Sequence, residues 1–139
     1  MKDPKPSVFA IVQDKHGAIL LVRKKYGKFD WTCPGGFMET GETPQQAISR
    51  ETKEESNCTI RNIDFRHVYA IPDRSDVILT FTAEIDKVLE WNENNEISER
   101  SFFTLNNLPK PMTNETLRKI KDALSVKNSQ LLILATSDL

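Results

Sequence analysis

The chain has 139 residues, of which 38% are hydrophobic and 28% are charged, and its formal net charge is −1. This length and composition indicate one globular domain, residues 1–139, with its own hydrophobic core. The sequence has no basic tract for a nucleic-acid polymer, no apolar run long enough to span a membrane, and no secretory signal at its start. We therefore expect a cytoplasmic protein, monomeric or homodimeric, that acts neither on membranes nor on nucleic-acid polymers.

The first part of the chain predicts a β-hairpin followed by a glycine-rich turn. Residues 7–13 are rich in β-branched and aromatic side chains, and residues 18–24 return as a second strand after a turn at residues 14–17. The second strand ends in a short basic cluster that begins at Arg23; it is either a solvated strand end or a contact for substrate phosphates. The next segment, residues 31–36, reads WTCPGG, and its two glycines allow the backbone to approach a ligand or metal closely.

A helix is predicted over residues 44–56. Thr43 is a candidate N-cap, Gln46 completes a capping box with it, and Asn57 suits the left-handed position that ends many helices.

The same helix carries three carboxylates on one face, because positions i, i+3 and i+4 lie close together on a helix surface. These are Glu51, Glu54 and Glu55. Like charges at this spacing destabilise an isolated helix by roughly 0.2–0.5 kcal/mol per pair. A hard divalent cation, which prefers oxygen ligands, would offset that repulsion.

The rest of the chain predicts further strands and one more helix. Residues 59–71 read as extended structure with a break near residues 62–64, residues 77–85 alternate as a strand, and residues 97–105 form a last sheet strand. A second helix is expected over residues 114–126, with a core-facing stripe of Leu117, Ile120 and either Ala123 or Leu124. The apolar segment at residues 131–135 is compatible with an edge strand, a packing arm or a dimer contact.

The remaining candidate groups favour structural interpretations. Cys33 and Cys58 are interpreted as buried thiols in preference to a disulfide. His16 reads as a turn residue and His67 as a strand residue, without a catalytic role. The predicted order of elements along the chain, which is strands, a helix, further strands and a second helix, supports an α+β domain.

The stretch from Gly36 to Cys58 resembles the Nudix box, whose pattern is G-x5-E-x7-R-E-U-x-E-E-x-G-U with U a bulky aliphatic residue. The fixed positions that agree are Gly36, Glu42, Arg50, Glu51, Glu54 and Glu55. The departures are Thr52 and Cys58 at the aliphatic positions and Asn57 at the final glycine, none of which is a metal-binding position. The WTCPGG lead-in resembles the W-x-x-P-G-G segment common in this family. The resemblance implies a Nudix-like α/β/α sandwich with a central mixed sheet flanked by helices.

The resemblance also implies an activity and a cofactor. Members of this family hydrolyse a phosphoanhydride bond in a nucleoside diphosphate linked to another moiety, using Mg²⁺ or alternatively Mn²⁺. The expected substrate is therefore a small nucleotide, such as a nucleoside triphosphate, ADP-ribose or a related compound. The alternative is a Nudix-fold sensor that binds a nucleotide without cleaving it.

By their positions in the motif, the side chains of the box take implied roles in binding metal and in catalysis. Arg50 is expected to hold Glu51 in place. The metal ligands implied are Gly35, through its carbonyl, and Glu42, Glu51, Glu54 and Glu55.

The general base is not fixed by the box. Glu96 is a candidate because residues 94–103, NNEISERSFF, resemble an N-E-x-x-E-x-x-W-F stretch often found after it. Glu93 and Glu99 compete with Glu96 for this role, as does Glu51 within the box. Phe37 is a candidate for stacking on a nucleobase, because aromatic faces suit such contacts.

Overall fold

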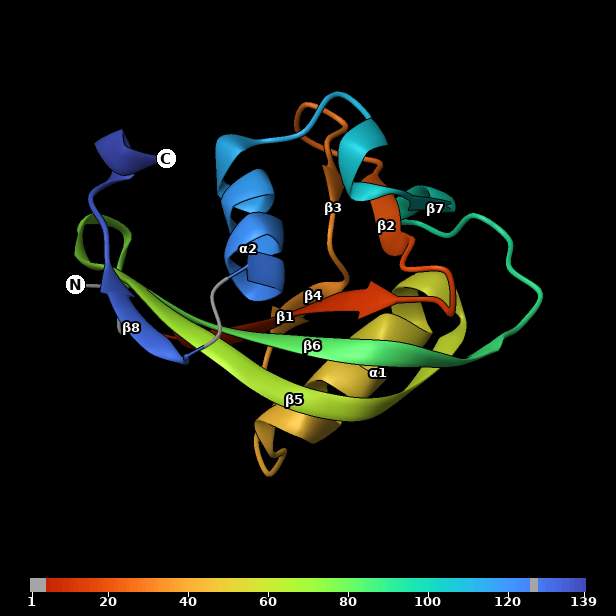
Figure 1. Cartoon of the computed structure of the whole chain (residues 1–139), viewed down its shortest axis with the longest axis horizontal. Coiled ribbons are helices and arrows are strands. Elements are labelled where there is room, and N and C mark those ends of the chain that lie inside the picture. Colours follow the sequence, from red (N-terminus) through yellow and green to blue (C-terminus); the bar gives the residue numbers. More distant parts are fainter. Residues whose placement is uncertain (1–4, 126–127) are drawn as a thin grey trace.

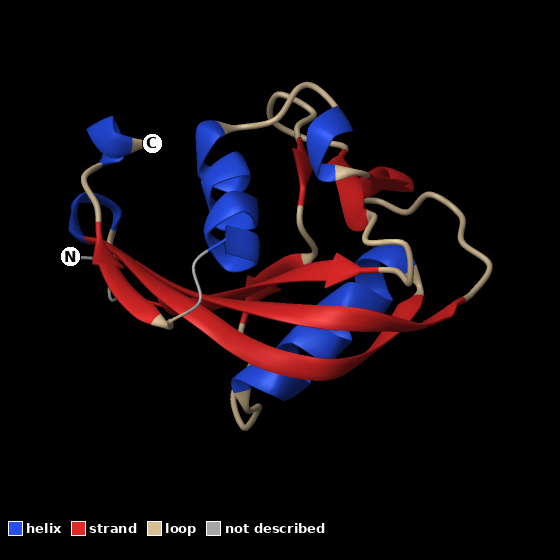
Figure 2. Cartoon of the chain, in the orientation of Figure 1, coloured by secondary structure: helices blue, strands red, loops and turns tan. Residues whose placement is uncertain are grey.

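The computed structural model describes residues 5–125 and 128–139, which form a mixed β-sheet with a helix on each face (Figures 1 and 2). The α+β sandwich expected from the sequence is therefore confirmed. The elements are β1 (Lys5–Gln13), β2 (Ile19–Lys24), β3 (Trp31–Thr32), β4 (Gly35–Phe37), α1 (Pro44–Ser56), β5 (Cys58–Ile71), β6 (Asp76–Val88), β7 (Ile97–Phe103), α2 (Asn114–Ser125) and β8 (Gln130–Ile133). Short 3-10 helices lie at Pro72–Arg74, Leu105–Asn107 and Thr136–Asp138. Within the described part of the chain, no helix is both long and apolar enough to cross a membrane.

The sheet places a glycine-rich strand at the centre of the molecule. Its strands follow the order β3-β2-β1-β6-β5-β8, with β4 paired to β1 and β7 paired to β2. β1 is parallel to β6 along its whole length, and the first part of β1 also pairs with β4, so that Phe9 lies opposite Gly35 and Val8 opposite Gly36. This register brings both glycines against residues 7–9 of β1, of which Ser7 and Val8 are buried and Phe9 is half-buried.

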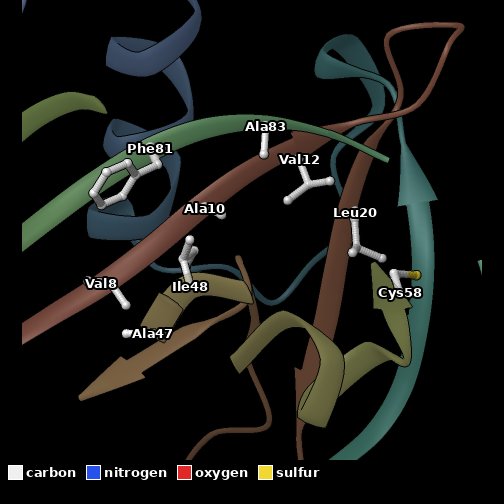
Figure 3. Packing of buried hydrophobic residues seen from close by; sticks show 9 residues of the cluster. All are labelled: Val8, Ala10, Val12, Leu20, Ala47, Ile48, Cys58, Phe81 and Ala83. Carbon is white, nitrogen blue, oxygen red and sulfur yellow. The ribbon is translucent and has the colours of Figure 1, made fainter. Parts of the chain in front are cut away.

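One core cluster fixes α1 against the sheet. Val8, Ala10 and Val12 of β1 point to the same face and pack with Ala47 and Ile48 of α1, as Figure 3 shows. The period of two in β1 supplies this face, and α1 contributes the buried residues Ala47 and Ile48, which lie one turn before Glu51 on the helix.

The second cluster fixes α2 on the other face, where Ile11 and Ile19 pack with Ile120 and Ala123. The predicted stripe on this helix is correct for Ile120 and Ala123, whereas Leu117 is only half-buried. Thr116 and Lys119 are buried in its place. Val126, the last residue of the predicted helix, lies outside the described residues.

The predicted ends of α1 are confirmed. The Thr43 hydroxyl accepts a hydrogen bond from the Gln46 backbone N–H at 3.2 Å, and the Gln46 side chain accepts one from the Thr43 N–H at 2.9 Å. Asn57 has a φ of 52° and ends the helix in the left-handed conformation. This geometry explains how asparagine can stand at the final glycine position of the box.

Several strand boundaries differ from the prediction. β6 continues to Val88, so the polar loop after it begins at residue 89 rather than 86, and β7 ends at Phe103. β5 is not broken near residues 62–64 but bulged there, with Asn62 at a φ of 51°. The apolar segment near the C-terminus forms β8, an edge strand parallel to β5. Cys33 and Cys58 are both buried and free, as expected.

Candidate active site

The glycine pair of β4 lies directly against two carboxylates of α1. The Gly35 backbone N–H donates a hydrogen bond to Oε1 of Glu55 at 2.9 Å. A Cβ atom on Gly36 would lie 2.8 Å from Oε1 of Glu51, closer than ordinary packing permits. The close approach of these residues therefore depends on glycine at both positions.

Arg50 binds the box carboxylates together. Its Nε and Nη2 atoms donate to the two oxygens of Glu42 at 2.6 and 3.0 Å, a bidentate pair. Its Nη1 atom donates to Glu51 at 3.0 Å and to Glu54 at 3.3 Å. Nη2 also donates to the Phe37 carbonyl oxygen at 3.1 Å, which ties β4 to the helix. The guanidinium thus lies where it can orient Glu51, the role that the motif implies.

The electrostatics of the site show an excess of negative charge. Burial raises the pKa of Glu55 to about 8 against the opposing effect of the Gly35 N–H, and the charges of Glu51, Glu96 and Glu54 raise it further. Burial also raises the pKa of Glu51, although Arg50 opposes that shift. The pKa of Glu42 is instead lowered, chiefly because Arg50 donates hydrogen bonds to it. A cation near Glu55 and Glu51 would relieve this repulsion.

The residues present fit a hard divalent ion in their chemistry, because every side-chain donor of the set is a carboxylate oxygen and the glycines leave room beside them. In residues 5–125 and 128–139, no three acidic, histidine or cysteine side chains are already arranged as a metal site. Glu51 and Glu54 instead share the Arg50 guanidinium. Arg50 takes one oxygen of each carboxylate, Oε1 of Glu51 and Oε2 of Glu54, so each carboxylate also has a second oxygen to offer an ion.

A cavity of about 900 Å³ opens over these carboxylates. Glu51, Glu55 and Glu96 all line it, together with Gly35 and Gly36. Three of the five predicted metal ligands, Gly35, Glu51 and Glu55, therefore share one space with the loop that carries Glu96, whereas Glu42 is not among the lining residues. The carboxylate of Glu54 instead lines a smaller neighbouring cavity, again with Glu55 and Glu96.

The three candidate bases of the loop and β7 have different surroundings. Glu93 pairs with Lys25 at 2.9 Å, and Glu99 pairs with Arg23 at 3.4 Å. Neither is among the residues that line the large cavity, whereas Glu96 is. The geometry therefore favours Glu96 among these three.

The two candidate substrate-binding residues also differ. Phe37 is 55% exposed and lines the cavity, so its ring is available to a ligand. Arg23 is not among the residues that line the cavity, and its Nε donates to the Phe29 carbonyl oxygen at 3.0 Å. Lys24, the next residue, lines the cavity instead. Successive side chains of a strand point to opposite faces of the sheet, so this alternation could have indicated that Arg23 and Lys24 do not face the same cavity.

Sequence reasoning missed the residues that hold the Glu96 loop against α1. Trp91 donates from Nε1 to the Glu55 carbonyl oxygen at 3.0 Å. Arg100 donates from Nη1 to the carbonyl oxygens of Ser56 at 2.7 Å and Leu89 at 2.9 Å, and its guanidinium lies 5.8 Å from the Trp91 ring centroid. These contacts satisfy carbonyl groups at the end of the helix. No pattern in the sequence marks such long-range partners.

Comparison with known proteins agrees with this geometry. The NUDIX domain model matches residues 3–124. The ADP-ribose pyrophosphatase of Methanocaldococcus jannaschii is 34% identical over 130 residues, which cover 90% of this chain and 76% of that protein. The NAD-capped RNA hydrolase NudC of Vibrio cholerae is 27% identical over 75% of this chain, and this chain spans only 39% of NudC.

The fold is also similar to that of a solved NUDIX hydrolase structure. A NUDIX hydrolase from Nitrosomonas europaea superimposes with a TM-score of 0.83 at 25% sequence identity, covering 98% of this chain and 81% of that one. The chain therefore belongs to the NUDIX family and is a Nudix hydrolase, a pyrophosphatase that acts on acid anhydrides.

Proposed function

We propose that this chain is a Mg²⁺-dependent pyrophosphohydrolase of a nucleoside diphosphate joined to a sugar, with ADP-ribose as the leading substrate. The observation that carries the proposal is the large cavity over the box carboxylates, which combines an acidic floor with exposed aromatic and basic side chains. The similarity to the archaeal ADP-ribose pyrophosphatase over 90% of the chain supports the choice of substrate.

Glu51, Glu54 and Glu55 are the proposed metal ligands, with Glu42 and the Gly35 carbonyl as further ligands. A divalent ion bound there would supply Lewis-acid activation and neutralise the phosphate charge that these carboxylates would otherwise repel. Arg50 holds Glu51 and Glu54 in position through the hydrogen bonds described above. The protein's own contribution is therefore a fixed, partly buried set of oxygen donors.

Glu96 is the proposed general base. It lines the same cavity as Glu51 and Glu55, and among the described residues it has no ion pair of the kind that occupies Glu93 and Glu99. A free carboxylate at this position can accept a proton from the attacking water. Lys24, which lies 5.7 Å from the Tyr26 ring centroid, is placed to contact a phosphate at the same end of the cavity.

The test is product analysis by chromatography with Mg²⁺ against ADP-ribose, ATP, 8-oxo-dGTP, NADH, a dinucleoside polyphosphate and a nucleoside diphosphate sugar. Cleavage of ADP-ribose to AMP and ribose 5-phosphate, abolished by Glu55→Gln, is the expected result. Cleavage of another member of the panel would reassign the substrate. If folded protein binds a nucleotide but releases no product, the chain is a sensor and the proposal is wrong.

A further inference from the structure

The cavity extends well beyond the acidic site. Gly35, which contacts Glu55, pairs with Phe9 of β1, whereas Asp76 at the start of β6 pairs with Lys5 of the same strand. Four residues of extended chain separate the two levels, or about 13 Å at roughly 3.3 Å per residue. A ligand that reaches both ends must therefore carry a sizeable group in addition to its pyrophosphate.

The far end is lined by four side chains of alternating charge, which we call the charged row: Asp76, Arg74, Glu115 and Lys119. Asp76 pairs with Arg74 at 3.1 Å, Arg74 pairs in turn with Glu115, and Glu115 pairs with Lys119 at 3.1 Å. Each charge has an opposite partner, so an added phosphate would compete with Asp76 and Glu115 for their cations. A neutral group with hydroxyls can instead exchange hydrogen bonds with the row without separating any pair.

Lys119 occupies the most enclosed position in the row. Its residue is only 4% exposed, and its Nζ atom lies 3.9 Å from the centroid of the Phe9 ring. A buried ammonium group is costly to retain, and an apolar side chain would fill the same place. An ammonium group also carries three N–H donors, more than one carboxylate oxygen of Glu115 takes up.

The two ends of the cavity suit different parts of a substrate. Phe37 and Tyr26 line the cavity and are 55% and 57% exposed. Partial burial raises the pKa of the Tyr26 hydroxyl, and the acidic groups Glu55 and Glu96 raise it further. The Phe37 ring is exposed for stacking on a base, whereas the Lys24 ammonium lies 5.7 Å from the Tyr26 ring centroid. At the far end the face of Phe9 is covered by Lys119. That end offers hydrogen bonds rather than a stacking surface.

We propose that the charged row is a subsite for the neutral, polyhydroxylated group on the far side of the pyrophosphate, and that Lys119 and Glu115 determine specificity by binding its hydroxyls. This inference rests on the proposed function and names the part of the substrate that its cavity selects. Lys119 donates to a hydroxyl oxygen, and Glu115 accepts from a neighbouring hydroxyl. Both residues act on binding and take no part in the proton transfer.

The test compares the binding of two uncleavable ligands by calorimetry with Mg²⁺. One is α,β-methylene-ADP-ribose, and the other is the methyl ester of α,β-methylene-ADP, which has the same charge but lacks the second sugar. The wild-type protein is expected to bind the first at least about tenfold more tightly, as hydrogen bonds to charged groups allow. Lys119→Met and Glu115→Gln should each bring this ratio close to one. Arg118→Met is the matched control, because Arg118 is adjacent on α2, pairs with Asp122 and is outside the described cavity lining.

The outcomes separate this inference from the proposed function. If ADP-ribose is not cleaved but the binding ratio is high and depends on Lys119, the subsite stands and the activity is wrong. If ADP-ribose is cleaved but the ratio is close to one, or is unchanged in both variants, the subsite is wrong and the activity stands. Melting curves for each variant exclude loss of folding as the cause of a lower ratio. A ratio that stays high in one variant alone removes that residue from the proposed specificity role.

Discussion

Gly36 and Glu51 are so close that a Cβ atom on the glycine would lie 2.8 Å from Oε1 of the glutamate and 2.9 Å from its carboxyl carbon. The neighbouring Gly35 is confined differently, because a Cβ there would lie 2.2 Å from the Val8 carbonyl oxygen and 2.4 Å from the Phe9 ring. One glycine therefore leaves room for a carboxylate at the end of a side chain, and the other leaves room for the backbone of β1.

This difference predicts that one alanine substitution will chiefly lower activity and that the other will chiefly lower stability. Gly36→Ala should change the melting temperature little, since the Glu51 carboxylate can swing aside, but the displaced ligand should lower kcat by about 10²-fold. Gly35→Ala should destabilise the fold by about 1–3 kcal/mol, because a strand has to move. Thermal melts and steady-state kinetics on both variants check this. Equal loss of stability in the two would show that the glycines have one shared packing role.

Arg50 is predicted to depend on the shape of its guanidinium as well as on its charge. Arg50→Lys keeps the charge but cannot form the bidentate pair with Glu42 and reach Glu51 at the same time. We expect Mn²⁺ affinity, measured by electron paramagnetic resonance, to fall by about 10–100-fold. Arg118→Lys, which alters a helix pair far from the box, serves as control. Unchanged Mn²⁺ affinity in Arg50→Lys would show that the Arg50 guanidinium does not position the metal-binding carboxylates.

The helix that carries the acidic residues was predicted correctly because its determinants are local. Spacing alone places Glu51, Glu54 and Glu55 on one face of the helix. The N-cap of that helix also depends only on residues that are close in sequence. The far end of the cavity was not predictable, because Arg74 and Glu115 meet only through the packing of α2 on the sheet. Lys119 reads as a surface lysine in a helical pattern, and nothing local indicates that it is buried beside Phe9.

The three loop and β7 glutamates give a test of the general base with internal controls. Glu96→Gln should lower kcat by about 10²–10⁴-fold and remove the acidic limb of the pH–rate profile. Glu93→Gln and Glu99→Gln should stay within a few-fold of wild type, since these carboxylates are exposed partners of Lys25 and Arg23. If Glu96→Gln keeps both its rate and its acidic limb, Glu51 becomes the better candidate.

Glu55 is predicted to make the metal-free protein sensitive to alkaline conditions. Burial raises the pKa of this carboxyl from 4.5 to about 8, so the folded protein keeps a proton that the unfolded chain loses. The resulting stability is complete below about pH 4.5 and is lost as the pH rises through 8. In EDTA, the melting temperature of wild type should therefore fall relative to that of Glu55→Gln across this window.

Mg²⁺ should raise the wild-type melting temperature more at pH 8.5 than at pH 6, because the ion takes over the neutralising role of the proton. Parallel melting curves for the two proteins in EDTA would show that Glu55 carries its charge in the folded state without cost, and that the acidic site does not need a cation to be stable.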